Sequence, residues 1–81
     1  MDIVKGCIVR SGAGHDKGRF MLVLDISPGY AFVVDGKERK IDKPKRKNVK
    51  HLFPTKTQVE LDKFETDAAI RRLLWKYNNK Q

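Results

Sequence analysis

The sequence predicts a mainly β protein: a small barrel of about five strands followed by a C-terminal α-helix. Two observations carry this prediction. Short apolar or β-branched segments alternate with turns that contain glycine or proline over residues 3–54, a pattern typical of small β domains. The apolar residues then take up the period of a helix. A chain of 81 residues forms one domain with a modest core, so we expect an exposed working surface.

The N-terminal part predicts two strands joined by a Gly-rich loop. Residues 3–9 are apolar and rich in β-branched side chains, and they predict the first strand. Residues 11–18 contain three glycines and predict a loop. Residues 20–24 are continuously apolar and are followed by a turn over residues 27–29. A short apolar run with such bounds is typical of a strand buried on both sides.

Residues 30–34 predict the third strand, because all of them except Ala31 are aromatic or β-branched. Asp35 and Gly36 follow, and this dipeptide predicts a type I′ turn, in which both central residues have positive φ. We therefore expect the chain to reverse directly into a fourth strand over residues 37–41. The many charges of that strand predict an exposed edge.

A basic loop and a fifth strand are expected to close the barrel. Residues 42–48 carry four Lys and Arg, and Pro44 removes a backbone donor, so a loop is predicted there. Residues 49–53 alternate loosely between apolar and polar side chains and predict the fifth strand. We expect Pro54 to end it.

The C-terminal segment predicts a helix that packs on the barrel. Four apolar residues lie at the spacing i, i+3, i+4 and i+7, which forms one helical stripe: Ile70, Leu73, Leu74 and Tyr77. Thr66 is the expected N-cap, and Asp67 lies in the first turn near the positive end of the helix dipole. A helix of about 12 residues is marginally stable alone, so its stripe should be buried. Trp75 lies off the stripe, where it either covers a barrel edge or is exposed.

Together these elements predict a barrel of SH3-like type over residues 1–54. Residues 55–81 form a linker and the helix within the same single domain. The alternative architecture is a sheet of three or four strands packed on a helix.

The positive charge is concentrated in one segment. The net charge is +8. Residues 1–36 have four cations and four acids and net zero, residues 37–54 have eight cations and two acids and net +6, and residues 55–81 net +2. The expected partner is therefore anionic, and a nucleic acid is favoured over a membrane surface.

The remaining features predict a cytoplasmic protein. Cys7 is the single cysteine, which excludes an intramolecular disulfide and fits a reducing compartment. Its apolar neighbours predict a buried thiol. The N-terminal residues do not resemble a signal peptide, and no apolar run approaches the roughly 20 residues that span a bilayer.

Catalysis is not expected. Cys7 with His15 or His51 does not form a recognisable thiol–imidazole motif. One cysteine and two scattered histidines also make a poor zinc site. We predict no catalytic residue, no metal and no cofactor.

The Gly-rich loop and the basic segment carry a family resemblance. Residues 9–26, with Lys17 and Gly18 in their loop, resemble a KOW motif: a strand, a loop that carries Lys-Gly, and a second strand. The chain departs from the usual motif at Phe20, where a second glycine is common. Residues 35–52 contain Asp-Gly-x-x-Arg-x-Ile-x-Lys-Pro-Lys-Arg-Lys. With them the chain resembles short bacterial KOW proteins related to the large-subunit ribosomal protein L14e, from about residue 2 to residue 54.

This resemblance implies an SH3-like barrel and RNA binding, with ribosomal RNA as one target. The basic side chains favour the same function, because structured RNA is recognised largely through phosphates and 2′-hydroxyls. Glycines in the first loop allow the backbone to approach a phosphate closely. If the two loops share one surface, their cations form one patch. The predicted RNA-binding residues are Arg10, Gly14, His15, Lys17, Arg19, Arg39, Lys43, Lys45, Arg46, Lys47, Asn48, Lys50 and His51.

Base stacking, a protein partner and a membrane surface are the alternatives to contacts with RNA phosphates. Tyr30 and Phe32 offer a stacking platform for bases, but their apolar strand favours core packing. The helix offers Ile70, Leu74 and Trp75 to a protein partner, so the alternative function is an SH3-like protein-interaction module of the translation or transcription machinery. Attachment to a membrane is disfavoured, since the basic loop lacks apolar anchors.

Overall fold

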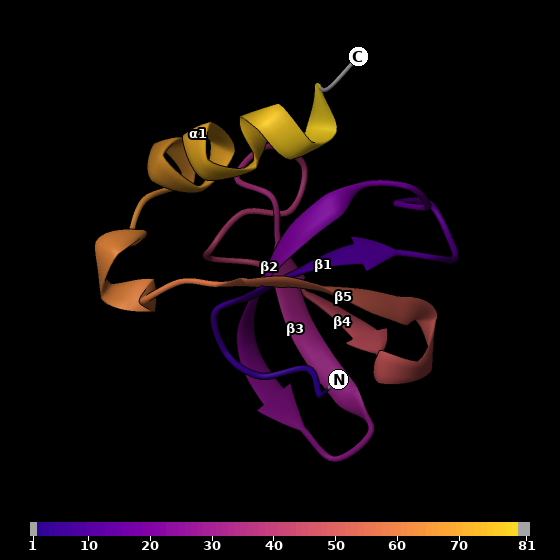
Figure 1. Cartoon of the computed structure of the whole chain (residues 1–81). Helices are drawn as coiled ribbons and strands as arrows, with labels where there is room; N and C mark the ends of the chain where they lie inside the picture. Colours follow the sequence, from indigo (N-terminus) through magenta and orange to yellow (C-terminus); the bar gives the residue numbers. More distant parts are fainter. Residues whose placement is uncertain (1, 80–81) are drawn as a thin grey trace.

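The computed structural model describes residues 2–79 and confirms the mainly β fold: five antiparallel strands form one sheet, and a helix follows. The strands are β1 (Cys7–Ser11), β2 (Phe20–Ser27), β3 (Tyr30–Val34), β4 (Lys45–Asn48) and β5 (Leu52–Gln58). The helix is α1 (Asp67–Asn78), and two 3₁₀ turns are η1 (Val49–His51) and η2 (Leu61–Lys63). Figure 1 shows α1 on one side of the curled sheet.

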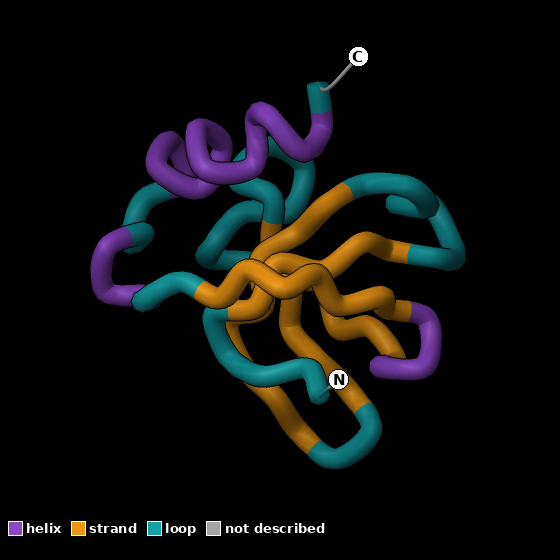
Figure 2. Tube along the Cα trace, in the orientation of Figure 1, coloured by secondary structure: helices purple, strands orange, loops and turns teal. Residues whose placement is uncertain are grey.

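The two edge strands of the curled sheet are neighbours in the chain. The strand order is β4-β3-β2-β1-β5, and η1 alone joins β4 to β5. Figure 2 shows this short turn between the two edge strands. The arrangement agrees with the predicted small SH3-like barrel of five strands.

The centre of the sheet is buried on both faces. Met21 and Val23 point to a cluster inside the curl, whereas Leu22 between them packs in a second cluster with Ile70 and Leu74 of α1. These three residues of β2 are fully buried. This confirms the prediction for β2, since a strand with both faces covered needs consecutive apolar residues.

The helix forms as predicted. Thr66 caps it, with its hydroxyl accepting a hydrogen bond from the amide of Ala69 at 3.1 Å. Ile70 and Leu74 are buried in the second cluster, so the predicted protein contact through these two residues is wrong. Trp75 is 62% exposed and is an exposed aromatic rather than a cover for the barrel edge.

The predicted hairpin at Asp35 and Gly36 is wrong. Gly36 has φ +79°, but none of the non-glycine residues in the described chain has a positive φ, so Asp35 cannot take its place in a type I′ turn. Instead the Asp35 carboxylate accepts hydrogen bonds from the amides of Lys37 and Arg39, each at 2.9 Å. The side chain thus folds the backbone into a compact loop, and residues 37–41 form no strand.

Several other boundaries differ from the predictions. β2 runs to Ser27 rather than ending at Leu24, and residues 49–51 form the 3₁₀ turn η1 rather than the start of the fifth strand. β1 begins at Cys7 rather than Ile3, and the basic segment from Lys45 to Asn48 is strand β4 rather than loop. β5 continues through Pro54 to Gln58. Pro54 is tolerated because β5 is an edge strand, in which a missing backbone donor can face away from the ladder.

Candidate nucleic-acid interface

Asp16 is buried in the Gly-rich loop and binds two cations from distant segments. Its Oδ2 atom lies 3.3 Å from Arg39 Nε and 3.6 Å from Lys47 Nζ. Lys47 also donates a hydrogen bond to the carbonyl of Ala13 at 3.0 Å. The Lys47 side chain is only 8% exposed, so its charge serves the fold.

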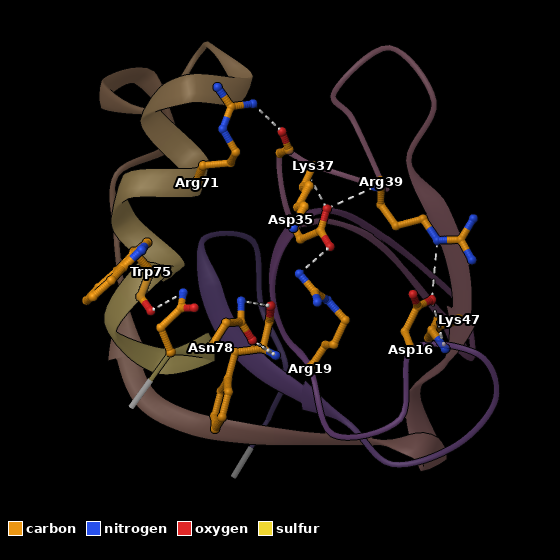
Figure 3. Close-up of polar contacts among 12 residues, drawn as sticks. Asp16, Arg19, Asp35, Lys37, Arg39, Lys47, Arg71, Trp75 and Asn78 are labelled. Atoms are coloured by element: carbon orange, nitrogen blue, oxygen red, sulfur yellow. Dashed lines mark hydrogen bonds and ion pairs between the residues drawn. The ribbon is translucent and has the colours of Figure 1, made fainter. Parts of the chain in front are cut away.

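Asp35 is the second buried carboxylate. Its Oδ2 atom lies 3.2 Å from Arg19 Nη2, and its side chain is fully buried. Because Arg39 contacts Asp35 through its backbone and Asp16 through its side chain, the two acidic centres are linked. Figure 3 shows Arg19 pointing to Asp35, and Arg39 and Lys47 meeting at Asp16.

These contacts show how the two loops lie relative to each other and which of the predicted cations are held by aspartates. The Gly-rich loop and the basic segment do share one surface, since Lys47 of β4 reaches Ala13 and Asp16. Yet Arg19, Arg39 and Lys47, three of the predicted RNA-binding cations, are held by buried aspartates. They are poorly placed to exchange these partners for phosphates.

The other predicted cations are exposed. Within residues 2–79 they form no ion pair with an acidic side chain. They are Arg10, Lys17, Lys43, Lys45, Arg46 and Lys50.

Two of these arginines lie over exposed aromatic rings. The guanidinium carbon of Arg46 is 4.7 Å from the centre of the Tyr30 ring, and that of Arg10 is 4.9 Å from the Phe53 ring. Tyr30 is 37% exposed and Phe53 is 50% exposed. Tyr30 is therefore not a core residue, contrary to expectation, while Phe32 is half-buried.

The two Arg–aromatic pairs flank η1. Arg46 precedes η1 on β4, and Tyr30 pairs with Asn48 at the end of β4. Phe53 follows η1 on β5, where it pairs with Arg10 of β1. Exposed Lys50 and His51 lie on the turn between them. We call this set the η1 surface: Arg10, Tyr30, Arg46, Lys50, His51 and Phe53.

The remaining predicted RNA-binding residues are Asn48, Gly14 and His15. Asn48 caps η1 by accepting a hydrogen bond from the amide of Lys50 at 3.0 Å. Gly14 has φ +79°, and a side chain there would face Lys47 Nζ at 3.5 Å. His15 is exposed in the same loop.

Sequence reasoning missed Phe53 and misjudged Tyr30. Phe53 lies against Gly12 so closely that any side chain at that glycine would overlap its ring. Only the pairing of β1 with β5 brings Arg10 to Phe53, which lies 43 positions further along the chain. A lone phenylalanine in a short apolar segment gives no signal of this contact.

Cys7 is buried, and burial raises the pKa of its thiol above the ordinary value of 9.0. Within residues 2–79, no three His, Cys, Asp or Glu side chains are grouped so as to hold a metal ion. None of the helices in the described part is long and apolar enough to cross a membrane.

A comparison of the chain with known protein families finds none that matches. The resemblance to KOW proteins therefore stays a prediction from the sequence.

Proposed function

We propose that this protein binds structured RNA through its phosphate backbone and acts without catalysis. The observation that supports the proposal best is the η1 surface. It combines three exposed cations, a histidine and two Arg–aromatic pairs around one short turn.

The chemistry of this surface suits RNA. Flexible cations can follow the phosphate groups, and an arginine stacked on a ring keeps its guanidinium edge free to donate to phosphate. Exposed rings can stack on unpaired bases. Lys45, Lys43 and Lys17 extend the positive surface beyond η1 along β4 and the two loops.

Ribosomal RNA is the first target to test, on the strength of the resemblance to ribosomal KOW proteins. The SH3-like protein-interaction module is the weaker alternative, because two of its three predicted contact residues are buried.

The test is a titration of the protein with fragments of structured ribosomal RNA at near-physiological salt, followed by fluorescence anisotropy. The variant Lys45→Ala with Arg46→Ala should weaken binding at least about tenfold, since each charge-assisted phosphate contact contributes roughly 1 kcal/mol or more. The matched control is Lys56→Ala with Lys63→Ala, which removes the same charge away from the η1 surface.

Equal losses in the two double variants would argue for attraction by net charge alone and against the η1 surface. If the wild-type protein binds none of the RNAs, the proposal is overturned. A protein partner captured after nuclease treatment, and kept by a Lys45→Glu, Arg46→Glu variant, would then support the interaction module.

A further inference from the structure

A charged pocket lies between α1 and the loop after β3, away from the η1 surface. It has a volume of about 540 Å³. The side chains that matter here are Arg19, Asp35, Lys37, Lys40, Arg71 and Trp75. Four of them are cations, and Arg19 is held by the fully buried carboxylate of Asp35. Lys37, Lys40 and Arg71 remain to face a ligand, so the accessible wall is positive.

The loop that forms one wall is fixed in place. Asp35 binds the amides of Lys37 and Arg39, and Asp67 of α1 accepts a hydrogen bond from the amide of Ile41 at 2.9 Å. Gly36 lies against the helix so closely that a Cβ atom there would overlap the Asp67 carbonyl oxygen. The loop and the helix thus form one rigid unit, which lowers the entropy lost on binding a ligand.

Arg71 is oriented by the same unit. Its Nη1 atom donates a hydrogen bond to the Gly36 carbonyl at 2.7 Å, as Figure 3 shows. A guanidinium has five N–H donors, so the others stay available to an anion. Lys37 and Lys40 are exposed and flexible at the same pocket.

Trp75 extends the pocket into a second hollow. This shallower depression is lined by Ala68, Arg71, Arg72 and Trp75, so it shares Arg71 and Trp75 with the first. Figure 3 shows the indole turned outward from the helix, away from Asp35. A flat exposed ring beside a positive pocket matches the two parts of a nucleotide, a base that stacks and a phosphate that pairs with cations.

We propose that this pocket binds the phosphate of a nucleotide and that Trp75 stacks on its base. The nucleotide is either an unpaired residue of the bound RNA or a free nucleotide. The first assignment rests on the proposed function, and the second does not.

Trp75 makes the test direct, because it is the single tryptophan of the chain. Its fluorescence is titrated with adenosine monophosphate, with inorganic phosphate and with a short single-stranded RNA, while RNA binding is followed separately by anisotropy. We expect the nucleotide and the RNA to quench Trp75, and phosphate to displace the nucleotide. Lys37→Ala with Lys40→Ala should weaken the nucleotide effect by roughly tenfold or more, and the Lys56→Ala, Lys63→Ala control should not.

The outcomes separate the two proposals. RNA that binds without changing Trp75, together with no effect of the nucleotide, would overturn the pocket and leave the proposed function standing. Quenching by the nucleotide in a protein that binds no RNA would support the pocket as a site for free nucleotides and remove the proposed function. Quenching that survives the Lys37, Lys40 substitutions unchanged would also overturn the pocket.

Discussion

Two buried aspartates determine which cations of this protein stabilise the fold and which remain exposed at the surface. Asp16 and Asp35 are buried and hold Arg19, Arg39 and Lys47. A buried charge needs a partner, since an unpaired carboxylate in the interior costs several kcal/mol. Three cations are therefore committed to stability, and the exposed ones remain for an anionic partner.

The sequence predicts the basic surface, but it does not indicate which of its cations are held by buried aspartates. Arg39 lies 23 positions from Asp16, and Lys47 lies 31 positions from it. Neither separation is a helical or strand spacing, so the pairing depends on how the loop and β4 meet in space. A single sequence does not distinguish a lysine that forms a buried ion pair from a lysine that is exposed to solvent.

Gly36 gives the first residue-scale prediction. It has φ +79°, and a Cβ atom there would overlap the Asp67 backbone oxygen. Gly36→Ala should lower the free energy of unfolding by about 2–3 kcal/mol, because backbone strain adds to the displacement of α1. Gly29→Ala is the matched control, with φ +81° and no atom within 4 Å of the added group; it should cost about 1 kcal/mol. Urea unfolding measures both, and equal losses would contradict the close contact.

Cys7 gives a pH dependence. Burial raises the pKa of its thiol above 9.0, so the folded state binds this proton more tightly than the unfolded state does. The resulting stability is fully present below the pKa of the unfolded thiol and is lost as the pH rises through the raised pKa. The free energy of unfolding that Cys7 contributes relative to a Cys7→Ala variant should thus be smaller at pH 10 than at pH 7. A difference that stays constant or grows would show that burial does not perturb the thiol.

At the scale of elements, the docking of α1 depends on a polar contact as well as on its apolar stripe. Asn78 accepts a hydrogen bond from the Phe20 amide at 2.8 Å and donates one to the Phe20 carbonyl at 3.2 Å. Its side chain pairs with β2 much as another strand would. The Phe20 ring also packs on Tyr77, with ring centres 5.3 Å apart.

Asn78→Ala should therefore lower the free energy of unfolding by about 1–3 kcal/mol, because two partly buried backbone groups lose their partners. It should also accelerate hydrogen exchange at the Phe20 amide. Asn79→Ala is the control, since that side chain donates a hydrogen bond to the Trp75 carbonyl at the exposed end of its own helix. Unchanged exchange at Phe20 in the Asn78 variant would mean that the apolar stripe alone holds α1.

Elements with local signals were predicted well. The apolar stripe and Thr66 fix α1, and aromatic and β-branched residues fix β3 with its observed bounds. The loop after β3 was not predictable, because Asp-Gly is compatible with two structures. In a type I′ turn both residues take positive φ, whereas here Asp35 binds two amides and Gly36 meets the helix. The docking of α1 selects the second structure, and that contact is not local.

On the scale of the whole molecule, a group of exposed cations lies beside the turn that joins the two edge strands of the sheet. β4 and η1 carry Lys45, Arg46 and Lys50, and Arg10 on β1 adds to them across β5. The curl of the sheet and the pairing of β1 with β5 thus bring Arg10, from the N-terminal part of the chain, to the turn that follows Lys45 and Arg46. The net charge of +8 should attract RNA from a distance, and this arrangement should decide which face meets it.

Salt dependence tests this division of charge across the molecule. If the six exposed cations each neutralise one phosphate, the logarithm of RNA affinity should fall with the logarithm of salt concentration with a slope of about −4 to −5. Lys45→Ala should make that slope less steep by roughly 0.7–0.9 and leave the free energy of unfolding within about 0.5 kcal/mol of wild type.

Lys47→Ala should have the opposite effects. It should leave the slope unchanged and lower the free energy of unfolding by about 2 kcal/mol or more, since Asp16 loses a buried partner. Anisotropy at several salt concentrations and urea unfolding give both quantities, and a slope that responds equally to the two substitutions would show that Lys47 leaves Asp16 to contact RNA.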